Sequence, residues 1–492
     1  MKASNLVKHT KTACLAALGI AVAGCGANPE SSSNDLGEVG TVSSAVTATA
    51  PAVDLIAIGT ISGSISDRSK ATAAPLENGV AGNLLGGLGS GLAHAGGDFF
   101  VALPDRGPNA VPFDSALDDT VSYINRFQTF ELALRRNAPG AALPFSMTPE
   151  LLATTLLWTT DPLVYGTGDP EGGVGDGTPS LNRGHVSFFT GRSDNFDPSK
   201  LSTDTSDARL DPESIRVSTD GLRVYVSDEY GPYVYEFDRL TGRRLRTFAI
   251  PEAFGVANLS PQGAVEISDN TSGRVANKGM EGLALTPDGK TLLGAMQSPL
   301  LQDGGTNGRF TRLVKITIAT GAISEYAYEL TNIGTATKPK FPTVSDIVAV
   351  NAHEFLVDER DGNGLASDNA AVFKQLNHID IDGATDVTGI SGDGNLDGTT
   401  IPKTLFLDIV ATLNAHGIAS TEIPAKLEGV AFGRDVVVAG QLVHTLYVSN
   451  DNDFLATITD TTHPNGVDNP NHFFVFAVPR SALPTYVPEP IL

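Results

Sequence analysis

Acidic residues recur at the ends of short predicted strands in this chain, and they are its best candidates for chemistry. Glu213 opens one such strand, and the adjacent Asp228 and Glu229 close the next strand along the sequence. In an antiparallel hairpin the start of one strand lies beside the end of its partner, so these three acids should meet. Carboxylates gathered in one place can hold a hard divalent cation or act as general acids and bases.

The stretch that carries these acids, residues 210–251, reads as four consecutive strands. Apolar and polar positions alternate along it, and turn signals interrupt it at Asp220-Gly221 and Thr241-Gly242. From Glu213 onward, related units follow at intervals of roughly 65 to 80 residues. The other units are marked by Gly89, Glu281, Asp346 and Glu428.

Repeated units of four short strands predict an all-β fold, a β-propeller of about six four-stranded blades. Five units are visible, and the interval between Gly89 and Glu213 leaves room for one more. We expect a strand near Ile56 to pair with C-terminal strands near Phe474, because this pairing closes the ring and hides its edges.

A propeller would gather the repeated polar residues on one face, around the axis. Carboxylates that face one another repel, which raises their pKa values or demands a counter-cation. Oxygen ligands without thiolates or clustered histidines favour Ca²⁺, with Mg²⁺ as the alternative. The alternative is that acids at strand ends accept backbone N–H bonds and hold blades together. The predicted ring comprises Asp105, Arg106, Glu213, Asp228, Glu229, Glu281, Gln297, Asp346, Glu359, Arg360, Glu428, Asp451 and Asp453.

We divide this ring into three groups by chemistry. Four residues are candidate catalytic acids or bases: Glu213, Glu229, Glu281 and Glu428. Three are candidates for binding an anionic substrate, helped by Lys278 and Lys426: Arg106, Arg360 and Gln297. Five are candidate metal ligands: Asp105, Asp228, Glu359, Asp451 and Asp453.

A second calcium signal lies outside the ring, in residues 393–398. Asp393, Asn395 and Asp397 match the first half of an EF-hand loop, and Gly398 supplies its sharp turn. The twelfth position is Thr404 instead of the bidentate glutamate that completes such a site. The segment is therefore either a weaker Ca²⁺ loop or a Gly-Asp turn.

The N-terminus predicts export and lipid attachment. Three lysines precede a short apolar run, and small residues lead to Cys25, as in a bacterial lipobox. We expect residues 1–24 to be a lipoprotein signal peptide, residues 25–52 a flexible tether and residues 53–492 the folded domain. Such a protein would be anchored by lipid to the bacterial outer membrane. The alternative is an ordinary signal peptide with an incidental cysteine.

Composition excludes several classes of function. The formal net charge of −23 argues against a nucleic acid partner. The two cysteines are Cys14, inside the signal, and Cys25, so we expect neither a disulfide nor a thiolate metal site. There is no Gly-x-Ser-x-Gly elbow and no His-Glu-x-x-His motif, which argues against a serine hydrolase of that type and a zinc protease.

Eight motifs occur in order along the chain: LPDRGPN, LDPESIRVSTDG, VSDEYGPYVYEFD, ANKGMEGLALTPDG, AMQSPL, FLVDERDGNG, KLEGVAF and SNDNDF. Together they resemble the phytase-like family, named for the esterase-like activity of phytase, from about Asp54 to Pro479. The resemblance implies an extracytoplasmic β-propeller that hydrolyses a phosphoester or another ester of a small anionic substrate. We expect a monomer whose only membrane contact is its lipid anchor. The alternative is a non-catalytic propeller that binds a ligand or protein on the same face.

Overall fold

The computed structural model describes residues 52–108, 120–166 and 175–491. The predicted signal peptide, Cys25 and nearly all of the predicted tether therefore lie outside the described residues. Within the described part, no helix is both long enough and apolar enough to cross a bilayer.

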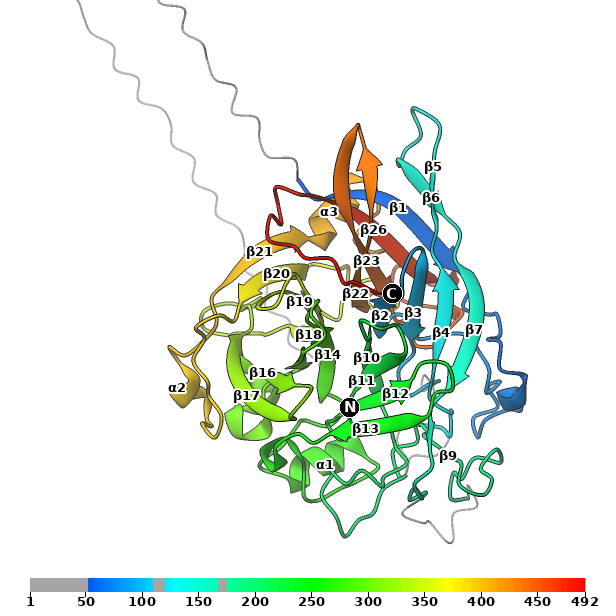
Figure 1. Cartoon of the computed structure of the whole chain (residues 1–492), viewed down its shortest axis with the longest axis vertical. Coiled ribbons are helices and arrows are strands. Elements are labelled where there is room, and N and C mark those ends of the chain that lie inside the picture. The colour runs from blue at the N-terminus through cyan, green and yellow to red at the C-terminus, as the bar shows by residue number, and fades with distance from the viewer. Residues whose placement is uncertain (1–51, 109–119, 167–174, 492) are drawn as a thin grey trace, which may run out of the picture. The chain divides into compact units, whose positions relative to one another are not determined.

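Five antiparallel four-stranded sheets form a closed ring, which is a β-propeller (Figure 1). Blade 1 comprises β2 (Gly91–His94), β3 (Phe99–Leu103), β4 (Arg126–Glu131) and β7 (Glu150–Leu156). Blade 2 comprises β10 (Pro212–Val217), β11 (Arg223–Asp228), β12 (Val234–Asp238) and β13 (Arg244–Phe248). Blade 3 comprises β14 (Met280–Leu285), β15 (Thr291–Met296), β16 (Phe310–Thr317) and β17 (Ala322–Glu329).

The two remaining blades complete the ring. Blade 4 comprises β18 (Thr343–Ala349), β19 (Glu354–Arg360), β20 (Lys374–Asp380) and β21 (Lys403–Asp408). Blade 5 comprises β22 (Leu427–Val438), β23 (Gln441–Asn450), β26 (Asn471–Pro479) and β1 (Asp54–Ile61). In blade 5 the N-terminal strand pairs with the C-terminal one, and Ile58 lies opposite Phe474. The predicted closure of the ring is confirmed.

The number of blades is five, not about six. The interval between Gly89 and Glu213 holds one blade and two short hairpins instead of two blades: β5 (Leu134–Arg136) with β6 (Phe145–Met147), between β4 and β7, and β8 (Trp158–Thr159) with β9 (Ser187–Phe188), between β7 and β10. β8 joins the outer edge of blade 2, where the Trp158 N–H donates to the Gly242 carbonyl at 3.0 Å. The hairpins therefore add no sixth blade.

The other elements lie in the connections. A further hairpin pairs β24 (Thr457–Ile458) with β25 (Val467–Asp468). The helices of the described part are α1 (Gly263–Asp269), α2 (Asp393–Leu396) and α3 (Ile409–Ala415), with 3₁₀ turns at Lys70–Thr72, Glu252–Phe254, Leu301–Asp303 and Gly305–Asn307.

The first strand of each blade lines the axis, and these inner strands pack closely. A Cβ at Gly282 would lie 3.0 Å from the Asp346 backbone, so an inner strand needs glycine there. Arg216 of β10 reaches across to β18 and pairs with Asp346 at 2.8 Å. Its guanidinium also donates to the Leu92 carbonyl of β2 at 2.7 Å. Both charged side chains are almost fully buried, so this pair closes the axis of the ring.

Candidate functional site

A β-bulge in the inner strand of four blades determines which residues face the cavity. The pairing register shifts between Pro212 and Ile215 in β10, and the shift recurs in β14, β18 and β22. Bulges re-aim side chains, and they are common beside active sites. The residues that share the bulge position are Glu213, Glu281, Ser345 and Glu428.

This register corrects one sequence prediction. Asp346, which we expected in the ring of acids, lies one residue beyond the bulge position, and Ser345 stands beside the glutamates. Asp346 instead accepts hydrogen bonds from Arg216, from the Ser214 hydroxyl at 2.9 Å and from the Val430 N–H at 2.9 Å. It is part of the pair that closes the axis.

The second strand of each blade supplies another set of cavity residues. Asp228, Met296, Glu359 and Asn450 pair with the residues that start the bulges. Successive residues of a strand point to opposite faces, so the next residue in each blade faces the cavity. These cavity residues are Glu229, Gln297, Arg360 and Asp451.

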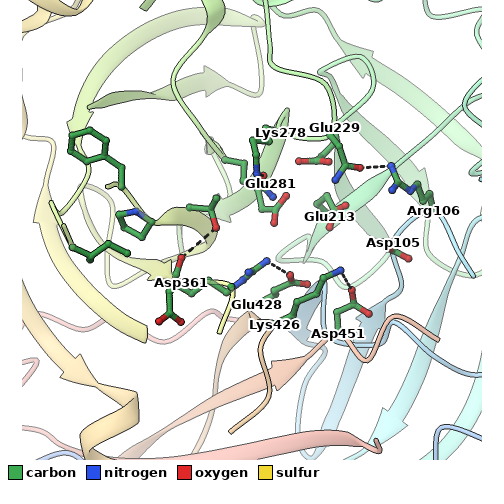
Figure 2. A pocket seen from close by; sticks show the side chains of 18 of the residues that line it. Asp105, Arg106, Glu213, Glu229, Lys278, Glu281, Asp361, Lys426, Glu428 and Asp451 are labelled. Atoms are coloured by element: carbon green, nitrogen blue, oxygen red, sulfur yellow. Dashed lines mark hydrogen bonds and ion pairs between the residues drawn. The ribbon is translucent and has the colours of Figure 1, made fainter. Parts of the chain in front are cut away.

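The three glutamates at the bulges and the four second-strand residues line a cavity of about 370 Å³ on one face of the ring (Figure 2). The lining has more acidic than basic side chains. Seven are acidic: Asp105, Glu213, Glu229, Glu281, Asp361, Glu428 and Asp451. Five are basic: Arg106, Lys278, Lys340, Arg360 and Lys426. The structure thus brings together all four predicted catalytic residues and all three predicted substrate-binding residues.

On one side of the cavity, acids and bases neutralise each other. Arg360 pairs with Glu428, and its guanidinium is almost fully buried. Lys426 pairs with Asp451 at 2.7 Å and also with Asp453. The Arg360–Glu428 pair joins blades 4 and 5 and holds Arg360 at the edge of the cavity, whereas the Lys426 pairs lie within blade 5.

The opposite side holds acids in excess. Burial raises the pKa of Glu213 well above its ordinary value, and the charges of Glu281 and Asp211 raise it further. Burial also raises the pKa of Glu281, and the charge of Glu229 adds to the effect. The Glu281 Oε2 atom is buried and has no hydrogen-bond partner among the described residues. The pKa of a third acid, Asp105, is also raised, by burial and by the charge of Asp451.

Three of these acids have the geometry of a metal site. Carboxylate oxygens of Asp211, Glu213 and Glu229 lie within 4.8 Å of one another, and all three residues are buried. The Asp211 carboxylate accepts from the Arg106 backbone N–H at 3.0 Å and pairs with the Arg106 guanidinium at 3.4 Å. Sequence reasoning missed Asp211, although its place just before Pro212 and Glu213 put it at the same end of the blade.

Two further lysines line the cavity, one beside this acidic group and one across from it. The Lys278 Nζ donates to the Gln297 Oε1 at 2.8 Å. Burial lowers the pKa of Lys278, while the charges of Glu229 and Glu281 act against that shift. Lys340, which the sequence did not single out, lies at the far side of the cavity.

Three of the predicted metal ligands do not line the cavity. Asp228 accepts backbone N–H bonds from Asp211, Tyr230 and Gly231 at 2.9–3.0 Å. Glu359 accepts bonds from Tyr328, Lys403, Asn377 and the Thr331 N–H, which tie blade 3 to blade 4. Asp453 pairs with Lys426. Their contacts match the alternative in which such acids hold the fold together.

The EF-hand-like segment lies away from the cavity, at α2 on the periphery of the ring (Figure 1). Arg309 contacts Asp397 at 3.0 Å and Asp393 at 3.5 Å. The Asn395 amide donates to the Ser391 carbonyl at 2.7 Å. A guanidinium therefore lies between the two carboxylates that the sequence suggested as ligands.

A comparison with curated proteins finds a relative that is described as secreted. A relative from Arthroderma benhamiae, described as an uncharacterized secreted protein, is 30% identical over 368 residues, which cover 64% of this chain and 66% of the relative. The chain thus spans about two thirds of that protein's length, and the relative's description is consistent with export.

Two solved structures resemble the chain at low identity. The periplasmic gluconolactonase PpgL of Pseudomonas aeruginosa is 12% identical, with a TM-score of 0.34, over 87% of this chain and 99% of that one. The β-propeller domain of Cps50 (Swd1) from Myceliophteria thermophila is 11% identical, with a TM-score of 0.21, over 48% of this chain and 51% of that one.

A family model covers most of the described propeller. The model, described as phytase-like with the esterase-like activity of phytase, matches residues 83–454. This range contains the Asp211–Glu213–Glu229 cluster and every residue that lines the cavity. The chain belongs to the phytase-like family.

Proposed function

We propose that this protein is an extracytoplasmic hydrolase that cleaves a phosphoric or carboxylic ester in the propeller cavity, with Ca²⁺ as its metal. One observation carries the proposal. The cavity region places a cluster of buried carboxylates, and the unpartnered Oε2 of Glu281, beside lysine and arginine side chains. Carboxylates can hold a cation and move protons, while the basic groups can bind an anionic substrate.

The donor set fits a hard cation. Asp211, Glu213 and Glu229 offer only oxygen ligands, which Ca²⁺ prefers, and Ca²⁺ tolerates irregular geometry. The buried Glu281 Oε2 has no partner in the described part of the chain, so a further oxygen is available. A divalent cation held there would supply Lewis-acid polarisation of the ester oxygen.

The remaining residues have distinct roles in this proposal. Glu281 accepts a proton from the attacking water, because it is a buried carboxylate at the cavity with one oxygen that has no hydrogen-bond partner among the described residues. Arg106 and Arg360 stabilise negative charge on the ester oxygens. Glu428 positions Arg360 through their buried ion pair.

The cellular location is part of the proposal. We propose that the chain is exported and anchored by lipid on Cys25 to the bacterial outer membrane. The support is the lipobox-like sequence that ends at Cys25, together with a relative described as secreted.

Hydrolysis of p-nitrophenyl phosphate and p-nitrophenyl acetate, in buffered Ca²⁺ and in chelator, tests the function. We expect Ca²⁺-dependent turnover of at least one ester. The absence of turnover in both conditions, from a protein that melts cooperatively, would leave the non-catalytic binding propeller as the better account.

A further inference from the structure

The cavity has two chemically unlike ends. Its apolar wall comes from residues 331–343, which connect blade 3 to blade 4 and contribute Ile333, Phe341 and Pro342 to the lining. The acidic residues Asp105 and Glu213 belong to blades 1 and 2. In the ring β18 neighbours β14 and β22 but not β2, so the apolar wall lies across the cavity from Asp105.

The apolar wall is built to keep its shape. The Ile333 N–H donates to the Lys340 carbonyl at 2.8 Å, which closes the connection into a loop. The Asn332 side chain accepts from the Gly334 N–H at 2.9 Å and the Lys340 N–H at 3.2 Å. Phe341 packs against the core between blades 3 and 4 and remains partly exposed at the cavity. A fixed, half-exposed aromatic ring favours an apolar group on the ligand.

The charge of the lining limits how much negative charge a ligand can carry. Seven acids face five bases, and three of the bases already contact an acid: Arg106, Arg360 and Lys426. Lys278 and Lys340 are the lysines in the described cavity without an acid within ion-pair distance. With one divalent cation bound and every group ionised, the lining is close to neutral, so it has no surplus positive charge for a highly charged ligand. A polyphosphate such as phytate would face unpaired carboxylates, and like charges repel across an interface.

We infer, resting on the proposed function, that the substrates are small esters with one anionic or ester group and one alkyl or aryl group. The anionic group lies near Lys278 and the carboxylate cluster, and the apolar group lies against Ile333 and Phe341. In the reaction, water adds to the phosphorus or acyl carbon, the bond to the alcohol oxygen breaks, and a proton from water ends on the alcohol. Polyphosphorylated inositols are not substrates.

Binding of two non-hydrolysable probes tests the ligand class without turnover. In Ca²⁺-buffered calorimetry, phenylphosphonate should bind at least about tenfold more tightly than methylphosphonate, because the phenyl ring buries apolar surface at the wall. Phe341→Ala should reduce this preference to within about threefold, and Ile333→Ala should reduce it less. Leu240→Ala, which truncates an 88% exposed side chain between β12 and β13, should preserve it.

Two results would overturn the inference. One is equal binding of the two phosphonates by the unmodified protein. The other is phosphate release from phytate as fast as from phenyl phosphate at matched free Ca²⁺. Esterase turnover with no phenyl preference would reject the ligand class and leave the hydrolase standing. A phenyl preference abolished by Phe341→Ala, with no turnover of any ester, would support the ligand class and reject the hydrolase.

Discussion

Glu281 lies in an environment unlike that of an ordinary surface acid. It is buried at a β-bulge, one of its oxygens has no partner among the described residues, and its neighbours are acids. These features suit a group that exchanges protons with a bound water.

Glu281→Gln should lower kcat about 10²- to 10⁴-fold with little change in KM, because it removes a proton acceptor and keeps the shape. Steady-state kinetics on the ester that the protein hydrolyses fastest would measure this. Glu329→Gln, on an exposed part of β17, is the matched control and should leave kcat unchanged. An unchanged kcat in Glu281→Gln would remove Glu281 from the catalytic role.

The same substitution should change how stability depends on pH. The pKa of Glu281 in the folded protein is well above its ordinary value of 4.5, so the folded state holds a proton that the unfolded state releases. In the presence of a chelator, the free energy of unfolding of the unmodified protein should therefore fall as the pH rises above about 4.5. Glu281→Gln has no such titratable proton, so the difference between its Tm and that of the unmodified protein should grow in favour of the variant between pH 5 and pH 8. A Tm difference that stays constant or shrinks over this range would contradict the assigned pKa direction.

The sequence alone could not predict which of two adjacent residues at the end of a strand faces the cavity. The sequence placed Asp228 and Glu229 at the right end of the blade, and register shows that Glu229 is the one inside. Each bulge adds one residue to the strand and so changes which side chains point toward the cavity. Asp346 was placed wrongly for this reason. Asp211 was missed because an Asp-Pro pair also reads as an ordinary turn.

At the scale of elements, the inner strands are held together by one buried ion pair. Arg216 and Asp346 connect β10 with β18, and their further bonds reach β2 and β22. Breaking a buried pair leaves an uncompensated charge, which is strongly destabilising.

Asp346→Asn should lower the free energy of unfolding by about 3–5 kcal/mol, measured by urea denaturation. The double substitution Arg216→Met with Asp346→Leu should lose less than the single one, because no charge is left unpaired. A loss below about 1 kcal/mol in Asp346→Asn would show that the pair does not hold the axis closed.

Strand prediction succeeded where turn signals were clear. The four strands predicted within residues 210–251 correspond to β10–β13, with Asp220-Gly221 as the turn between β10 and β11. The predicted sixth blade failed because the residues between β4 and β7 and between β7 and β10 form short hairpins instead of a four-stranded sheet. The alternation of apolar and polar residues predicts a strand, but it does not indicate whether short strands form a new blade or extend an existing one.

At the scale of the whole molecule, the proposed lipid anchor makes a separate prediction. In a bacterial host, the unmodified protein should fractionate with the outer membrane and incorporate a labelled fatty acid. Cys25→Ser should be unlabelled and soluble after export, whereas Cys14→Ser should behave like the unmodified protein because the signal peptide is removed. Equal membrane association of all three proteins would reject the anchor.

The propeller places the buried Asp211–Glu213–Glu229 cluster of blade 2 beside a cavity lined by residues of several blades, and the proposed activity depends on that cluster binding a cation. The most direct test is the rate of ester hydrolysis as a function of free Ca²⁺, for the unmodified protein and for Glu213→Gln. We predict a rate that saturates with Ca²⁺ and vanishes in chelator, and a variant that needs at least about tenfold more Ca²⁺ for half its maximal rate. Full activity in chelator, or identical Ca²⁺ curves for the two proteins, would contradict the account.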